Sequence, residues 1–548
     1  MPSPTALDPH RHPRWPWLLL ALGLAWTSVI RVPMILNAED HLDSDLAVDG
    51  LTLLDAVRGH WRWHYPGTPH MGILPVLASY PQAIAFGTNP ATLVSGGTVL
   101  WMMVVGSTFG LAWRAFGPRV AAWAMVPLIF SSEGTIWLSA RITGGHLLSL
   151  AWHAIAFWGL ARCLQEGRRR SAAILGVWCG IGVYNDAMGL FTIAGIVAGA
   201  ILARRPVHRS SILAYAAGVG VGLLPLAVGR WMDPYDAYPS QFQATYAVPA
   251  MAGHVEILVR DCLPRLLAGA RLRGAAAWSA AGWLSILMMA AFTVSIVRLG
   301  VLAIRSDDPV RRGVAGGTLA SALLITSAFL VNRNIYDSDN YRYLVFLLVP
   351  WSLGLGAGLD NLARRGAGGW GSAGLIAATM ALGMTLDTQA WYRHTRTYLN
   401  DGIVPVVRKH PSWDGLIVVH DRADGHGQKA RAEKFRIPSD VTHVFGGYWD
   451  VYRLAFLSGG RVVGVPYTMY PNRFRRWSLG LGPGRGKILI LRPGEERSTD
   501  RPASESPGRP HRRVRSARDI DWHPAMETAW RADSRDPSEL GELAVVVP

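Results

Sequence analysis

Long apolar runs constrain the fold of this chain more than any other feature of its sequence. They follow one another up to Trp391, with only short Arg-rich or Gly/Pro-rich breaks between them, and they stop after it. Half of the 548 residues are hydrophobic and 17% are charged, against about 25% charged residues in soluble domains. Because a membrane-spanning helix needs about 20 mainly apolar residues, the sequence predicts a polytopic helical membrane domain over residues 1–391.

About eleven segments are predicted to span the membrane. Segment 71–88 is also apolar, but it contains Pro75 and Pro81. Counting it would also move Arg114 and Arg119 to the outer side, so it is left out. The predicted spans are residues 15–33, 92–113, 118–131, 146–164, 171–184, 187–203, 211–230, 277–303, 313–332, 342–363 and 371–390.

Arginine placement predicts the orientation of these spans. With this set, the short Arg-rich loops fall on one side of the membrane and the longer loops on the other. Cytoplasmic loops collect Arg and Lys, so we expect the N-terminus inside and the C-terminus outside. The expected location is the inner (plasma) membrane, with the active site and the C-terminal domain on the external or periplasmic side. This topology accounts for the net charge of +16, so the sequence predicts no nucleic-acid partner.

The pattern changes after the last predicted span. Short β-branched runs at 416–419 and 441–445 are typical of strands, so residues 392–493 are predicted to form a small external α/β domain. Residues 494–548 are rich in Arg, Ser, Pro, Glu and Asp, and they are predicted to be a disordered tail. The expected fold class is therefore a mainly α polytopic membrane protein with a small soluble domain behind it.

Carboxylates are concentrated in the first outer loop, residues 34–91. Charged groups this close to a membrane face are costly when buried, so they mark either a site or a hydrated loop. Asp43 or Ser44 suits the N-cap of a short helix that carries Asp45. For Asp49 and Asp55, the simpler interpretation is a solvated face of that helix.

Histidines in the same loop raise the question of a metal. His60, His64 and His70 are spaced by four and six residues and could converge on one ion with Asp43 or Asp45. The aromatic residues among them suit an interfacial belt equally well. The sequence therefore predicts no certain cofactor and no metal ligand, with a divalent metal as the alternative.

Three stretches resemble a known group of enzymes. The first outer loop, at 45–48, 50–51, 65–67 and 70–72, is similar to that of membrane glycosyltransferases of the GT-C type. The narrower resemblance is to the group related to protein O-mannosyltransferases, aminoarabinose transferases and Rgt-type lipopolysaccharide glycosyltransferases. Residues 339–344 and 448–458 resemble two later motifs of the same group, in the same order. One position departs: Leu46 stands where the group usually has an acidic residue.

The resemblance implies an inverting transfer of sugar from a polyprenyl-phosphate donor to a hydroxyl on a glycan, lipid or protein. Such a donor carries a good leaving group, so the reaction needs one base for the acceptor proton and cations for the departing phosphate. Asp45 is the candidate base, with Asp43 as a substitute. Arg342 and Arg141 are the candidate phosphate ligands, since guanidinium geometry suits phosphate, although arginines at a membrane face also snorkel. The candidate substrate-binding residues are His64, Tyr65, His70, Tyr448 and Trp449.

Other interpretations of the same sequence stay open. A polytopic chain could be a lipid or solute transporter or flippase, although we see no internal repeat of the kind many transporters carry. Leu46 also raises the alternative of a GT-C scaffold that has lost activity. The stretch 448–458 could be an ordinary amphipathic helix, and Asp186 could be either an exposed turn residue or part of a cavity.

Overall fold

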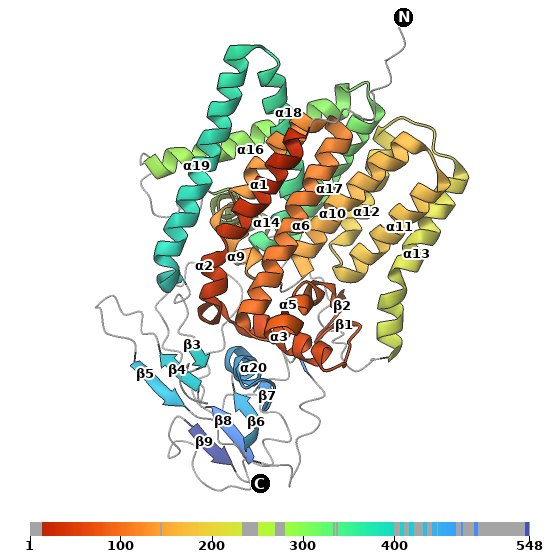
Figure 1. The fold of residues 1–548 in the computed structure, drawn as a ribbon. Coiled ribbons are helices and arrows are strands. Elements are labelled where there is room, and N and C mark those ends of the chain that lie inside the picture. Colours follow the sequence, from red (N-terminus) through yellow and green to blue (C-terminus); the bar gives the residue numbers. More distant parts are fainter. Residues whose placement is uncertain are drawn as a thin grey trace, which may run out of the picture.

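Helices account for most of this chain in a computed structural model. The structure describes residues 14–142, 145–232, 250–268, 280–332, 335, 338–398, 406–409, 416–420, 431–435, 441–446, 448–466, 473–474, 487–491 and 543–546. The main helices are α1 (Trp15–Val29), α6 (Pro90–Phe116), α10 (His146–Glu166), α11 (Arg169–Asn185), α12 (Gly189–Leu202), α13 (Arg209–Met232), α16 (Ala280–Arg305), α17 (Pro309–Val331), α18 (Leu348–Ala363) and α19 (Ala367–Tyr398). They form the bundle in the upper part of Figure 1.

The prediction of a polytopic helical membrane protein is confirmed, whereas the number of spans is not established. Within the described residues, eight helical stretches are long and apolar enough to cross a membrane. The segment predicted at 118–131 consists of α7 (Pro118–Ala124) and α8 (Val126–Ile129), and a bend of 82° separates Pro118–Ile129 from α9 (Glu133–Ser139). Counting that bent pair as one span gives up to nine.

Besides segment 118–131, two of the predicted spans do not meet this test: 171–184, which lies in α11 of 17 residues, and 187–203, which lies in α12. Helix α12 has 14 residues, so it reaches only about 21 Å, whereas the hydrocarbon core is about 30 Å thick. It packs closely on α17, where a Cβ added at Gly199 would lie 2.5 Å from the carbonyl oxygen of Gly313. Small residues that let helix backbones approach are typical of membrane bundles.

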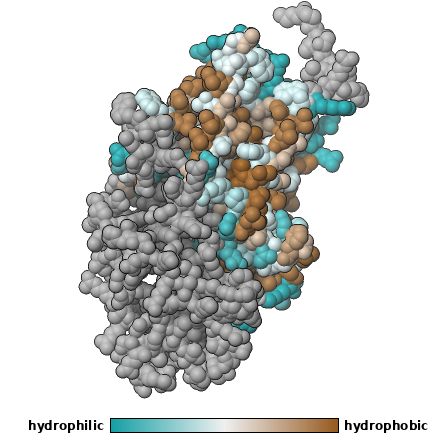
Figure 2. All heavy atoms as spheres, turned by 60° about the vertical axis from the view of Figure 1, so that its left-hand side comes forward, coloured by the Kyte–Doolittle hydropathy of each residue, from teal (hydrophilic) through white to brown (hydrophobic). Residues whose placement is uncertain are grey.

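Several helices turn apolar faces outward. Exposed large hydrophobic side chains include Leu22 on α1, Leu224 on α13, Leu287 on α16 and Leu382 on α19. In Figure 2 apolar side chains gather over the helical part of the molecule, with hydrophilic residues at its upper edge. Exposed apolar area of this extent is costly in water, and it fits a surface that faces lipid.

The first outer loop folds at one end of the bundle. It contains helices α2 (Val32–Leu36), η1 (Ala38–His41), α3 (Ser44–Val57), α4 (Leu74–Leu77) and α5 (Tyr80–Phe86), and the antiparallel strands β1 (His64–Tyr65) and β2 (Thr68–Gly72). The helices within segment 71–88, α4 and α5, are thus short, as expected for a segment that does not span. Later loops add α14 (Met251–Ile257), the π-helical turn η6 (Leu258–Cys262), α15 (Leu263–Leu266) and the 3-10 helix η8 (Ser338–Leu347).

The residues behind α19 that the structure describes form two sheets and one helix. Strands β3 (Val406–Lys409), β4 (Leu416–His420) and β5 (Arg431–Phe435) form an antiparallel sheet. A second sheet has the order β7-β6-β8-β9, built from β6 (Val441–Gly446), β7 (Val463–Pro466), β8 (Lys487–Leu491) and β9 (Leu543–Val546). Strand β9 lies within the stretch predicted to be disordered, and it pairs antiparallel with β8. The rest of 494–548 lies outside the described residues.

Helix α20 (Tyr448–Leu457) joins this C-terminal part to the first outer loop. It lies beside α3, at the end of the bundle opposite the first turn of α1 (Figure 1). The Ser44 hydroxyl donates to the carbonyl oxygen of Tyr448 at 2.6 Å, and Arg58 donates to the carbonyl oxygen of Gly459 at 2.9 Å. Gly50 faces the ring of Phe456 so closely that a Cβ at position 50 would overlap it.

This close approach gives a first prediction. Replacing Gly50 by Val should push α20 away from α3, because overpacking a buried contact costs about 1–3 kcal/mol. We expect a lower temperature of unfolding for the purified protein and faster proteolytic cleavage behind α19. Gly59 has open space around an added Cβ, but a side chain there would strain the backbone, because the φ of Gly59 is +87°. The control is therefore Arg461→Ala at an exposed position, and it should leave both measurements unchanged. Equal proteolysis of the Gly50→Val and wild-type proteins would contradict this packing.

Candidate active site

Asp43 begins the site. Its side chain accepts a hydrogen bond from the backbone N–H of Leu46 at 2.8 Å and so caps α3, one of the two caps expected from the sequence. Its other oxygen, Oδ2, pairs with Nη1 of Arg141 at 2.6 Å, and that guanidinium lies 3.9 Å from the centroid of the Trp137 ring. Burial raises the pKa of Asp43; Arg141 opposes this shift, and the neighbouring Asp45 adds to it.

Asp45 follows in the first turn of α3 and faces the C-terminal part of the chain. Its Oδ1 accepts a hydrogen bond from the Tyr448 hydroxyl at 2.5 Å and lies 3.4 Å from Nη2 of Arg473. Burial would raise the pKa of Asp45. The charge of Arg473, the Tyr448 hydrogen bond, and the charges of Arg342 and Arg141 outweigh it and lower that pKa below its ordinary value. Asp45 is therefore an ionised carboxylate at neutral pH.

Arg473 makes several contacts around this carboxylate. Its Nε donates to the Tyr448 hydroxyl at 3.0 Å and its Nη1 to the Thr68 hydroxyl at 3.2 Å. Its guanidinium lies 5.8 Å from the centroid of the Tyr65 ring. Sequence reasoning missed Arg473, which stands in no recognisable motif, so no local signal could have found it.

Arg342 lies in η8, directly before α18. Its guanidinium lies 5.3 Å from the centroid of the Tyr343 ring, and its charge reaches Asp45 strongly enough to lower the pKa of that carboxyl. Arg342 and Arg141 lie far from Asp45 in the sequence. In the structure the charges of both arginines nevertheless act on the Asp45 carboxylate.

The other predicted substrate-binding residues are placed differently. Tyr65 donates from its hydroxyl to the backbone carbonyl of Asp45 at 3.3 Å, so it supports the first turn of α3. His64 is buried in β1, where a Cβ added at Gly229 of α13 would lie 3.2 Å from its Nδ1. His70 lies in β2 and Trp449 in α20, but their side chains lie outside the described residues.

Two acidic residues differ from the simpler expectations. Asp49 is 1% exposed rather than solvated. Asp186 is not an exposed turn residue, because it is buried and its Oδ2 lies 3.1 Å from Nδ1 of His146. Over the part of the chain that the structure describes, no three His, Cys, Asp or Glu side chains gather as metal ligands.

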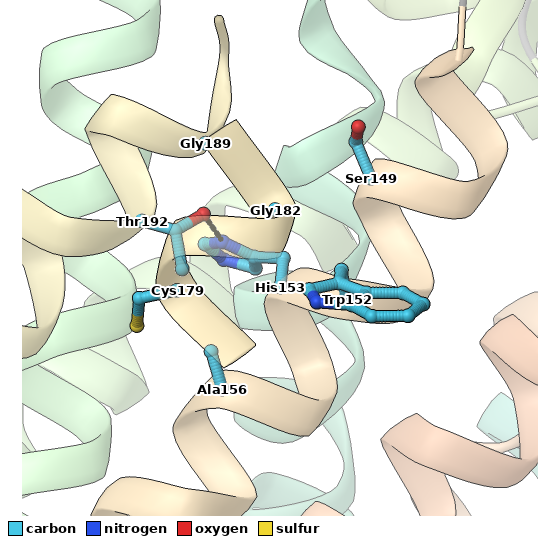
Figure 3. Close-up of a pocket in the computed structure, with 8 residues that line it drawn as sticks. All are labelled: Ser149, Trp152, His153, Ala156, Cys179, Gly182, Gly189 and Thr192. Atoms are coloured by element: carbon cyan, nitrogen blue, oxygen red, sulfur yellow. Dashed lines mark hydrogen bonds between the residues drawn. The ribbon is translucent and has the colours of Figure 1, made fainter. Parts of the chain in front are cut away.

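A small cavity lies away from these residues, between α10, α11 and α12 (Figure 3). His153 points into it and shares a hydrogen bond of 2.8 Å with the Thr192 hydroxyl, so one of its ring nitrogens is satisfied. Its lining includes neither Asp45 nor Arg342, and it belongs to the interior of the helix bundle. The lining residues are Ser149, Trp152, His153, Ala156, Cys179, Gly182, Gly189 and Thr192.

Comparison with known proteins gives likeness in structure only. No model of a known family matches this chain, and a search of curated proteins also gave no match. The apo structure of ArnT from Cupriavidus metallidurans has a TM-score of 0.53 at 12% identity, over 87% of this chain and 93% of its own. The same protein bound to undecaprenyl phosphate has a TM-score of 0.44 at 14% identity, over 88% and 94%.

An apo oligosaccharyltransferase from Archaeoglobus fulgidus has a TM-score of 0.49 at 13% identity and covers 84% of this chain. This chain spans only 65% of the length of that enzyme. The likeness to ArnT confirms the resemblance seen in the sequence: the chain has the fold of the GT-C membrane glycosyltransferases. At 12% identity the likeness establishes the fold alone, so the reaction has to be inferred from the site.

Proposed function

We propose that this protein is an inverting membrane glycosyltransferase that moves a sugar from a polyprenyl-phosphate donor to a hydroxyl acceptor. The reaction would take place at the external or periplasmic face of the inner membrane, where the first outer loop and the C-terminal domain are predicted to lie. The observation that carries the proposal is the ionised carboxylate of Asp45, surrounded by the cationic side chains of Arg473, Arg342 and Arg141. This arrangement suits a base beside a phosphate leaving group.

The proposed step is carried by side chains of the chain and by the donor's own leaving group. The acceptor hydroxyl oxygen attacks the anomeric carbon of the sugar, and a new glycosidic bond forms there as the bond to the phosphate oxygen breaks. The hydroxyl proton passes to Asp45, and the polyprenyl phosphate leaves with the electron pair of the broken bond. Arg342 and Arg141 are the proposed cations for the charge that builds on that phosphate, since a guanidinium can hold phosphate oxygens in pairs.

To bind the donor phosphate, Arg141 would have to leave its present partner, Asp43. Its guanidinium pairs with Asp43, and the phosphate of an incoming donor would compete with that carboxylate. Because burial raises the pKa of Asp43, a proton taken up by Asp43 would compensate for the loss of Arg141.

The lipid carrier to test first follows from the similar fold. ArnT, whose apo structure shares the fold, is also known bound to undecaprenyl phosphate. The exposed apolar faces of the helix bundle suit contact with the lipid chain of such a carrier. The acceptor is proposed to be a hydroxyl group on a glycan, lipid or protein of the cell envelope.

The test uses the full-length protein reconstituted in lipid vesicles. We expect it to release undecaprenyl phosphate from at least one member of a panel of undecaprenyl-phosphate sugars when envelope extract is supplied as acceptor. Mass spectrometry of envelope glycans from cells with and without the protein should show one missing sugar. Transport of the intact donor across the vesicle membrane without sugar transfer would contradict the proposal and favour a flippase.

A further inference from the structure

Two side chains that hold Asp45 come from the far end of the sequence. Tyr448 opens α20, and Arg473 follows β7, whereas Asp45 lies in the first outer loop. The three groups meet because α20 packs along α3. The first turn of α20 is anchored there by the hydrogen bond from the Ser44 hydroxyl to the Tyr448 carbonyl oxygen. The carboxylate is thus shared between the membrane domain and the part of the chain behind it.

The contacts on Asp45 are one-sided. The Tyr448 hydroxyl and the Arg473 guanidinium both engage Oδ1, at 2.5 Å and 3.4 Å. Arg473 also donates to the Tyr448 hydroxyl at 3.0 Å, so the two side chains support each other. Among the described residues no hydrogen bond is made to Oδ2 of Asp45, and the carboxylate side chain is 18% exposed. One oxygen is therefore held, and the other is available to a ligand.

The protonation states of Tyr448 and Arg473 allow both side chains to donate hydrogen bonds to the Asp45 carboxylate. Burial and the nearby charge of Asp45 keep the pKa of the Tyr448 phenol well above its ordinary value, so the phenol stays protonated and donates. Arg473 stays charged beside the carboxylate, because a guanidinium does not lose its proton in a protein. Without these two groups, burial and the carboxylate of Asp43 would favour a proton on Asp45.

We propose that Tyr448 and Arg473 are positioning residues for the reaction. They hold Oδ1 of Asp45 so that Oδ2 faces the acceptor hydroxyl as a free carboxylate oxygen. The active site is therefore complete only when the segment behind α19 is docked on α3. This inference rests on the proposed function in taking Asp45 as the base, but the state of the carboxylate can be measured without any transfer assay.

The experiment measures the pH dependence of carboxyl labelling at Asp45 in the purified full-length protein. A water-soluble carbodiimide with glycine ethyl ester as the amine modifies the protonated carboxyl, and mass spectrometry quantifies the product at Asp45. The variants are Tyr448→Phe, Arg473→Ala and Arg473→Lys. Arg58→Ala is the matched control, since Arg58 also joins α3 to the C-terminal part but contacts Gly459 rather than Asp45.

We expect the labelling midpoint to move to higher pH by about one unit in Tyr448→Phe and by about one to three units in Arg473→Ala, the range for loss of an adjacent opposite charge. Arg473→Lys should restore part of the Arg473→Ala shift, and Arg58→Ala should match the wild type. Where sugar transfer is measured, the acid limb of kcat/KM should move in the same direction.

Two outcomes would overturn the inference. One is a midpoint that is the same in the wild type, Tyr448→Phe and Arg473→Ala. The other is an equal shift in Arg58→Ala, which would mean that docking as a whole matters rather than these two side chains. If no donor is turned over but the midpoints shift as expected, the proposed function fails and the positioning of Asp45 stands. If sugar transfer occurs but the labelling midpoints are unchanged, the proposed function stands and the positioning role of Tyr448 and Arg473 fails.

Discussion

Replacing Asp45 by Asn is expected to lower the rate of sugar transfer by about 10²–10⁴-fold, the contribution of a well-placed general base. The amide can still accept the Tyr448 hydrogen bond, but it cannot take the acceptor proton. In the wild type, Arg473 and the Tyr448 hydrogen bond lower the pKa of Asp45 below its ordinary value of about 3.9. The rate should therefore be constant through neutral pH and fall only in acid, as Asp45 gains a proton.

Asp55→Asn is the control for this variant. Asp55 lies in the same helix, where it pairs with Arg62 at 3.0 Å, so its loss should change the transfer rate little. Both variants should bind undecaprenyl phosphate and unfold at similar temperatures. Normal transfer by Asp45→Asn would remove Asp45 as the base. The substitute base Asp43 would then be tested in the same way.

Replacing Arg342 by Ala is expected to lower kcat/KM by about 10²–10³-fold, the usual effect of removing one preorganised donor from developing negative charge. Arg342→Lys should recover only part of this loss, because an ammonium group is a point charge that cannot hold two phosphate oxygens in the way a guanidinium does. Labelled undecaprenyl phosphate should also bind more weakly to the Ala variant, which measures the phosphate contact without turnover.

The control is Arg364→Ala, because Arg364 follows the other end of α18 and pairs with Asp360 at 2.8 Å. It should bind undecaprenyl phosphate as the wild type does. Wild-type binding and turnover in Arg342→Ala would mean that the arginine only interacts with the membrane interface. The phosphate role would then fall to Arg141.

Local pattern predicted much of this architecture. The apolar runs correspond to helices, the side chain of Asp43 caps α3, and residues 448–457 form an amphipathic helix. Each of these depends on neighbours within a few turns, which is the range over which periodicity and capping act. The number of spans was not predictable in the same way, because α12 is shorter than a typical membrane-spanning helix and packs closely against α17.

Some features of the candidate site can also be predicted from the sequence, whereas others cannot. The sequence alone shows a carboxylate near the start of the first outer loop and arginines before later spans. It does not show that Asp45 contacts Tyr448 and Arg473, since more than 400 positions separate them. Local rules place a side chain on a face of its own helix, but which face it meets depends on the complementary shapes of α3 and α20. Gly50 against Phe456 is such a fit, and only the folded chain shows it.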